Sequence, residues 1–161
     1  MATPTNLPAS FVTGAVLTAA QQNALRGAFR ILQVVQGSTA TGVSTTSGTY
    51  VDTGLTATIT PQSTSSKILV VISQYMYTDT AATAMAVGIG RNGTLLNSWG
   101  GIAYGFGSPM IGQFTTNYLD SPASTSALTY KTQFKRDVGS GILYAQVNAN
   151  LATITLMEVS A

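Results

Sequence analysis

The side chains that could carry acid or base chemistry in this chain are five carboxylates: Asp52, Asp79, Asp120, Asp137 and Glu158. All except Glu158 lie in or beside predicted turns, and no two have the spacing that would place them on one face of the same strand. Asp52 ahead of Gly54 and Asp120 ahead of Pro122 are typical of turn formers. A carboxylate pair for glycoside hydrolysis would therefore have to be assembled by tertiary folding.

Two residue types central to catalysis are missing. The chain has no His, the usual general base near neutral pH, and no Cys, which removes thiolate chemistry and Cys-based metal sites. The oxygen-rich stretches 38–53 and 119–129 contain one carboxylate each, too few for an ordinary calcium site. Gly88, Gly90 and Gly93 have no helix after them and so predict no phosphate loop. We predict a non-enzymatic protein with no catalytic residue, metal site or cofactor.

The aromatic residues Trp99, Tyr104 and Phe106 lie among glycines. Aromatic rings on such a backbone can stack on sugar rings or fill a partner's pocket. The alternative is that they pack between subunits of a homo-oligomer, and the low charge of the chain favours that alternative.

Charge is scarce throughout the chain. Only 7% of residues are charged, against about a quarter in ordinary soluble domains. A rigid β protein rich in Thr and Gly, or a chain of moderate solubility, could share this composition. We favour a surface covered by copies of the same chain or by a larger assembly, because burying few charges avoids their desolvation. The seven scattered Lys and Arg form no nucleic-acid patch, and no signal peptide or membrane-spanning run is present, so neither nucleic acid nor membrane insertion is expected.

The elements that must position these residues begin with an N-terminal segment. Residues 1–11 predict an extended arm, and Thr18, Gln21 and Gly27 predict the limits of one short helix. Its narrow apolar stripe is a candidate for attachment to a larger particle or for packing on the chain's own domain: Leu17, Ala20, Ala24 and Leu25. We divide the chain into this attachment segment, 1–30, and a β domain, 31–161.

The β domain is predicted around its longest apolar run, Lys67 to Tyr77. We expect 56–60 to pair with it as a hairpin, 37–48 to be a surface loop, and Asn92-Gly93 to form a type I′ turn. About nine or ten short strands with regular turns predict an antiparallel β-sandwich of the jelly-roll type. The long run is apolar on both faces, whereas a sandwich covers only one, so a neighbouring subunit should cover the other.

Several segments resemble, in the same order, a module of bacteriophage tail-fibre and other structural proteins. They are LTAAQQNALR at 17–26, DTGLTATITP at 52–61, SSKILV at 65–70, YLDSP at 118–122, LTYK at 128–131 and ATITLMEV at 152–159. The resemblance implies a trimeric jelly roll similar to C1q and tumour-necrosis-factor-like domains, displayed on the virion. It defines no catalytic residues.

The resemblance and the short chain together favour a capsid decoration, cement or short-fibre protein. Such a protein is made in the host cytoplasm and attached through residues 1–30 to capsid or tail proteins. The alternative is a receptor- or carbohydrate-binding tail-fibre module that contacts host glycan through Trp99, Tyr104 and Phe106. A depolymerase is a third hypothesis, and the scarcity of carboxylates argues against it.

Overall fold

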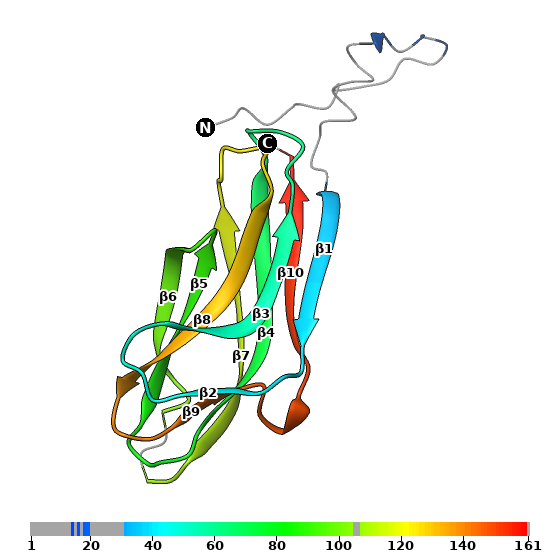
Figure 1. Ribbon diagram of the computed structural model, residues 1–161. Coiled ribbons are helices and arrows are strands. Elements are labelled where there is room, and N and C mark those ends of the chain that lie inside the picture. Colours follow the sequence, from blue (N-terminus) through cyan, green and yellow to red (C-terminus); the bar gives the residue numbers. More distant parts are fainter. Residues whose placement is uncertain (1–13, 15, 17, 20–30, 105–106, 161) are drawn as a thin grey trace.

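The computed structural model describes residues 14, 16, 18, 19, 31–104 and 107–160. The predicted arm and almost all of the predicted helix lie outside these residues. The described domain consists of ten strands and one short 3₁₀ turn (Figure 1). They are β1 (Ile31–Thr39), β2 (Val43–Thr45), β3 (Val51–Ile59), β4 (Lys67–Thr78), β5 (Ala84–Arg91), β6 (Thr94–Ile102), β7 (Met110–Asp120), β8 (Leu128–Val138), β9 (Leu143–Ala145), η1 (Val147–Ala149) and β10 (Ala152–Val159).

The strands form two antiparallel sheets packed face to face. In the first sheet the long strands have the order β1-β10-β4-β7, and the short strands β9 and β2 continue the sheet beside the last residues of β4. The second sheet has the order β3-β8-β5-β6. Eight long strands divided four to each sheet in these orders make a jelly roll. The predicted fold class is confirmed.

β4 is the central strand of the first sheet, as the apolar run predicted. Its even-numbered residues face the second sheet, and Ile68, Val70 and Ile72 are fully buried. Its odd-numbered residues, including Leu69 and Val71, stay partly exposed on the outer face of the sheet. One apolar face of β4 is therefore covered by the domain itself, and the other retains contact with solvent.

The predicted hairpin between 56–60 and β4 is wrong. β3 pairs with β8 in the second sheet, whereas β4 pairs with β10, β7 and β9 in the first. The polar turn residues 62–66 connect the two sheets instead of closing a hairpin. Two apolar strands joined by a turn can bury their inner faces against each other across a sandwich as well as side by side.

Small residues on β5 allow neighbouring side chains to approach its backbone closely. A Cβ added to Gly88 would lie 2.6 Å from Leu95 Cδ1 and 3.2 Å from Tyr50 Cε1. The turn that leads to β6 has φ of 48° at Asn92 and 87° at Gly93. Both values are positive, as a type I′ turn requires, so this predicted hairpin is confirmed.

Two further segments differ from the sequence-based prediction. The stretch 37–48 contains the end of β1 and the short strand β2, and is not simply a loop. Asp52 lies within β3 and not in a turn, and a bulge follows it at Gly54, where φ is 83°. Within the described part of the chain, no helix has the length and apolarity needed to cross a bilayer.

Candidate functional site

Asp120 and Glu158 are buried and accept hydrogen bonds from other side chains. Asp120, the last residue of β7, pairs with Arg91 Nη1 and accepts a 2.6 Å hydrogen bond from the Tyr130 hydroxyl. Burial, together with this bond to a carboxylate, raises the pKa of Tyr130 above its usual value. Because Arg91 and Tyr130 belong to the second sheet, the three side chains tie the two sheets together.

Glu158 accepts hydrogen bonds from Gln33 Nε2 at 2.6 Å and from the backbone N–H of Gln62 at 2.7 Å. Burial acts to raise the pKa of Glu158, but its hydrogen bonds outweigh burial and the pKa is lowered. The ionised carboxylate thus fixes the connection between β3 and β4.

The remaining carboxylates described also have structural partners. Asp52 accepts hydrogen bonds from Lys131 Nζ at 2.7 Å and Gln133 Nε2 at 2.8 Å, and Asp79 Oδ1 accepts one from the backbone of Ile142 at 2.8 Å. Among the residues that the structure describes, no group of three or more acidic side chains is placed to hold a metal ion. The bonds made by these carboxylates are contacts within the fold.

The outer face of the first sheet has an unusual composition. Its outward positions on β1, β10, β4 and β7 carry a single charged side chain, Lys67, at one end of β4. We call this surface the uncharged face. One row across its strands is entirely aliphatic: Val34, Met157, Leu69 and Leu119. Val34 and Leu119, at the two ends of this aliphatic row, are 56% and 52% exposed.

The next two rows of the uncharged face are polar except at Val71, and they carry no charge. The first is Gln36, Thr155, Val71 and Asn117, and the second is Ser38, Thr153, Ser73 and Thr115. Further along β4 come the partly exposed rings of Tyr75 and Tyr77. The centroid of the Tyr77 ring lies 5.5 Å from that of Tyr144 on β9.

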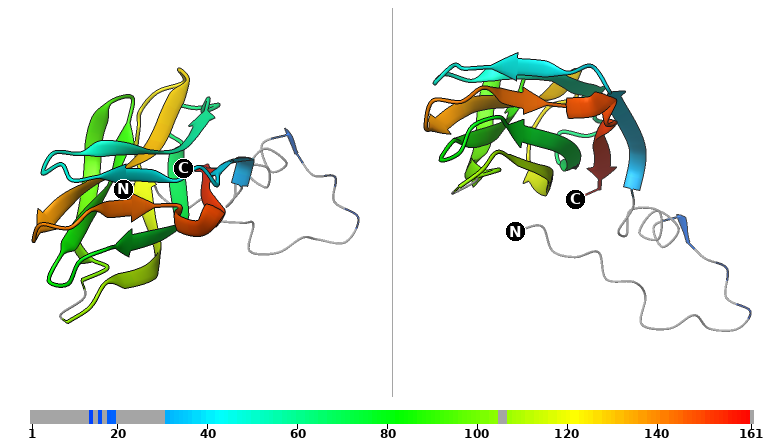
Figure 2. Two further views of the ribbon diagram at one scale, coloured as in Figure 1. Left: turned by 60° about the horizontal axis from the view of Figure 1, so that its bottom comes forward. Right: turned by 90° about the horizontal axis from the view of Figure 1, so that it is seen from below.

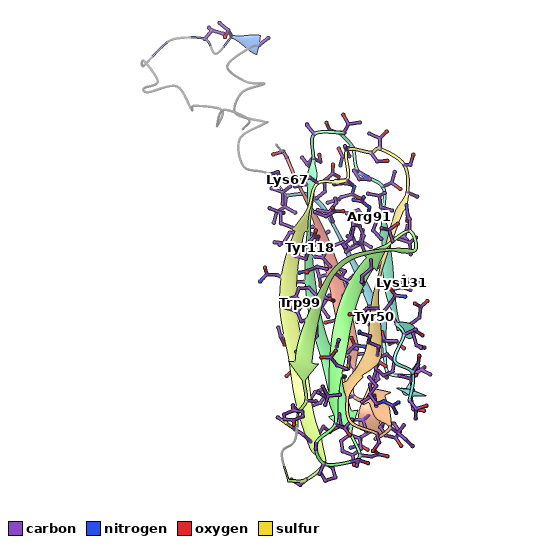
Figure 3. The ribbon with its side chains drawn as sticks, turned by 90° about the vertical axis from the view of Figure 1, so that its left-hand side faces the viewer. Tyr50, Lys67, Arg91, Trp99, Tyr118 and Lys131 are labelled. Atoms are coloured by element: carbon purple, nitrogen blue, oxygen red, sulfur yellow. The ribbon has the colours of Figure 1, made fainter. Side chains whose placement is uncertain are left out.

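The outer face of the second sheet has the opposite character. It carries the ion pair of Lys131 with Asp52, and Lys135 Nζ lies 5.4 Å from the centroid of the Tyr50 ring. Figure 3 shows Tyr50 and Lys131 on this side of the sandwich. Charge is therefore distributed unequally between the two faces of one small domain.

The predicted recognition residues are only partly described. Trp99, on β6, is partly buried and packs against the core, with its ring centroid 5.7 Å from that of Phe114 on β7 (Figure 3). Tyr104 is partly buried, and Phe106 lies outside the described residues. The attachment residues Leu17, Ala20, Ala24 and Leu25 also lie outside them.

An open hollow of about 400 Å³ lies where β2 and β9 meet the turn η1. We call it the β9 hollow. It is lined by Ala40, Gly42, Val43, Ser44 and residues 144–149. β2 and β9 lie side by side at the bottom of Figure 1 and come forward in the left view of Figure 2. The start of β1 and the end of β10 are paired at the opposite end of the sandwich.

The backbone of the β9 hollow is strained. Gln146, Asn148 and Ala149 have φ of 52°, 57° and 54°, the left-handed conformation that favours glycine. Asn150 bonds the carbonyl of Val147 through both its backbone N–H, at 3.2 Å, and its side chain, at 2.9 Å. Sequence reasoning missed this site because a left-handed run of non-glycine residues has no sequence signature.

Comparison with known proteins adds little. No family model matches the chain, and no curated protein matches it. Among solved structures it is similar to a chain of the Gt strain of infectious bursal disease virus, with 14% identity and a TM-score of 0.41 over 80% of this chain and 37% of that one. For the VP2 subviral particle of this virus the identity is 13%, the TM-score 0.38 and the coverage 80% and 39%. The chain spans well under half the length of these capsid chains.

Proposed function

We propose that the chain is a non-enzymatic structural subunit of a bacteriophage virion that assembles with copies of itself through the uncharged face. The observation that carries this proposal is the contrast between the two outer faces of the sandwich. The first sheet presents an aliphatic row and uncharged polar rows, whereas the second presents ion pairs.

This contrast favours self-association for two physical reasons. Burial of the aliphatic row removes apolar surface from water, which contributes roughly 25 cal/mol for each Å². The adjoining Thr, Ser, Gln and Asn side chains can exchange water for partner groups without the desolvation cost of a buried charge. A face that serves only as a solvated surface gains nothing from excluding charge.

The oligomer we propose is a homotrimer. The number of subunits rests on the resemblance to trimeric phage modules. The role, a capsid decoration, cement or short-fibre protein, rests on the same resemblance. The proposed absence of enzymatic activity is supported by the chain's lack of His and Cys and by the hydrogen-bonded state of Asp120 and Glu158.

Residues 1–30, with Leu17, Ala20, Ala24 and Leu25, are proposed to attach the domain to other virion proteins. Ile31 begins β1 beside Val159, so the chain enters the domain at one end of the sandwich (Figure 1). Attachment there would direct the β9 hollow away from the particle.

Co-sedimentation with purified particles tests this role. The full chain should sediment with particles that lack it, and a variant that lacks residues 1–30 should remain in the supernatant with an unchanged oligomeric state. A full chain that fails to bind any virion component, or a shortened chain that binds equally well, would contradict the proposal.

A further inference from the structure

We propose that the β9 hollow is a binding site for a neutral saccharide, with the Tyr144 ring as its stacking platform. This site is separate from Trp99, Tyr104 and Phe106 and does not depend on the proposed virion role. It rests on the shape of the hollow, its uncharged lining, its fixed aromatic ring and its strained backbone.

The lining selects the chemical class of the ligand. Residues 144–149 and the β1–β2 side of the hollow include no Lys, Arg, Asp or Glu, so the site offers no ion-pair partner to a phosphate or carboxylate ligand. It offers one aromatic ring and the polar side chains of Ser44 and Asn148, both of which are exposed. A ring face together with a few hydrogen-bonding groups suits a pyranose, which has an apolar face of C–H groups and a rim of hydroxyls.

The aromatic platform is held in place by a neighbouring ring. Tyr144 pairs with Tyr77 across β9 and β4, and their rings make a tilted contact with an interplanar angle of 36°. Tyr75, two residues along β4, faces the same side, and its carbonyl accepts a 3.0 Å hydrogen bond from the backbone of Gln146. A ring fixed by such contacts loses little freedom when a ligand stacks on it.

Gln146 has a left-handed backbone, and the hydrogen bonds of its side chain hold the wall of the hollow in place. Its side chain is fully buried, and the surrounding groups orient its amide so that the nitrogen donates to the carbonyls of Thr41, at 3.3 Å, and Thr53, at 3.2 Å. In this orientation its oxygen accepts a hydrogen bond from Gln74 Nε2. These bonds join three parts of the sandwich behind the hollow.

Left-handed non-glycine residues persist only where the surrounding structure forces them, and they gather at ligand sites. Here Gln146, Asn148 and Ala149 all carry this strain within one wall of a single hollow. A turn needed only to connect β9 and β10 could have avoided the strain with glycine. We infer that the strain holds the Asn148 side chain and the adjacent peptide groups at the rim of the hollow.

The site lies beside Tyr75 and Tyr77 at the far end of the uncharged face, well away from its aliphatic row. Leu69 in the aliphatic row and Tyr77, the cross-strand neighbour of Tyr144, are eight residues apart on β4. At the rise of an extended strand this separation is about 26 Å. Self-association through the aliphatic row can therefore leave the hollow open.

Saturation-transfer NMR with the full chain tests the proposal. The probes are the methyl glycosides of glucose, galactose, mannose and N-acetylglucosamine, each at about 10 mM to detect a dissociation constant near 1 mM. At least one glycoside should receive saturation at its ring C–H protons. No transfer to any of the four would overturn the proposal.

Variants then locate the binding. Tyr144→Ala should reduce the transfer at least about fivefold, as loss of an aromatic contact predicts, whereas Tyr144→Phe should preserve it. The matched control is Tyr50→Ala, a partly buried tyrosine on the opposite sheet, which should leave binding unchanged. Unchanged binding in Tyr144→Ala would overturn the site.

Glycine variants separate binding from folding. Asn148→Gly and Ala149→Gly both relieve left-handed strain, so each should raise the melting temperature. Only Asn148→Gly removes a polar side chain from the rim, and only this variant should weaken glycoside binding. Equal binding by both variants would show that Asn148 contacts no ligand and would contradict the proposed site.

Discussion

At the scale of single residues, Glu158 links the stability of the domain to pH. Its pKa is lowered in the fold from the ordinary value of 4.5, so the unfolded chain takes up a proton there more readily than the folded one. The stabilisation is present above pH 4.5 and is lost as the pH falls through the folded-state pKa.

Glu158→Gln should therefore lower the free energy of unfolding at pH 7 by about 1 to 3 kcal/mol, because hydrogen bonds to a charge are replaced by weaker ones. In urea denaturation between pH 3 and pH 7, the free energies of unfolding of the two proteins should become equal as the pH falls. A constant difference across this range would mean that the carboxylate is not held in its ionised form.

Gly37 on β1 lies against β3, where the edge strands of the two sheets meet. A Cβ added there would lie 1.9 Å from the carbonyl oxygen of Thr56 on β3. Gly37→Ala should destabilise the domain by about 2 kcal/mol or more, because β1 and β3 would have to separate.

Gly112→Ala on β7 is the matched control, since a Cβ there has no neighbour within 4 Å. Thermal melting of the two variants compares them directly. Equal melting temperatures would show that β1 and β3 can move apart at the edge of the sandwich without loss of stability.

Single residues also show which side-chain contacts could not be predicted from the sequence. Asp120, next to a proline-containing turn, appeared to be a simple turn former, yet it is buried between Arg91 and Tyr130. The partners of such a residue are set by the pairing of distant strands and not by its neighbours. The position of Tyr144 beside Tyr77 could not be predicted for the same reason.

At the scale of elements, the bonded side chains of Asp120, Arg91 and Tyr130 join the two sheets. We expect them to make the domain less stable at alkaline pH. The pKa of Tyr130 is raised above 10.0 by burial and by its bond to Asp120, so the folded state retains the phenol proton longer than the unfolded chain. This stabilisation is present below pH 10 and declines as the pH rises above it.

Tyr130→Phe should cost about 1 to 2 kcal/mol at pH 7 through loss of the hydrogen bond. It should also remove part of the fall in stability above pH 10 that the parent protein shows. Denaturation curves at pH 8 and pH 11 measure both effects. If the parent protein and Tyr130→Phe lose the same free energy of unfolding between these pH values, Tyr130 is not the titrating group.

Most strands could be predicted because apolar alternation is local. β8 shows this best, because the alternate residues Leu128, Tyr130, Thr132 and Phe134 are all buried. The pairing of β3 was not predictable, because a polar turn between two apolar strands does not reveal whether the second strand stays in the same sheet. β2 was missed because its three residues lack such alternation.

At the scale of the whole molecule, the uncharged face is the surface through which we expect the domain to assemble. The scarcity of charge in the sequence predicted a covered surface, and the structure locates that scarcity on one sheet. The sequence could not do so, because only strand pairing brings Val34, Met157, Leu69 and Leu119 into one row.

The mass of the protein in solution, measured by light scattering at high micromolar concentration, tests this central claim most directly. The parent chain and Thr58→Lys, a matched change on the exposed outer face of the second sheet, should both form the trimer. Leu69→Lys should give a folded monomer of 16.6 kDa, because a lysine in the aliphatic row would bury a charge at the interface. A parent chain that is monomeric, or a Leu69→Lys variant that remains trimeric, would contradict assembly through the uncharged face.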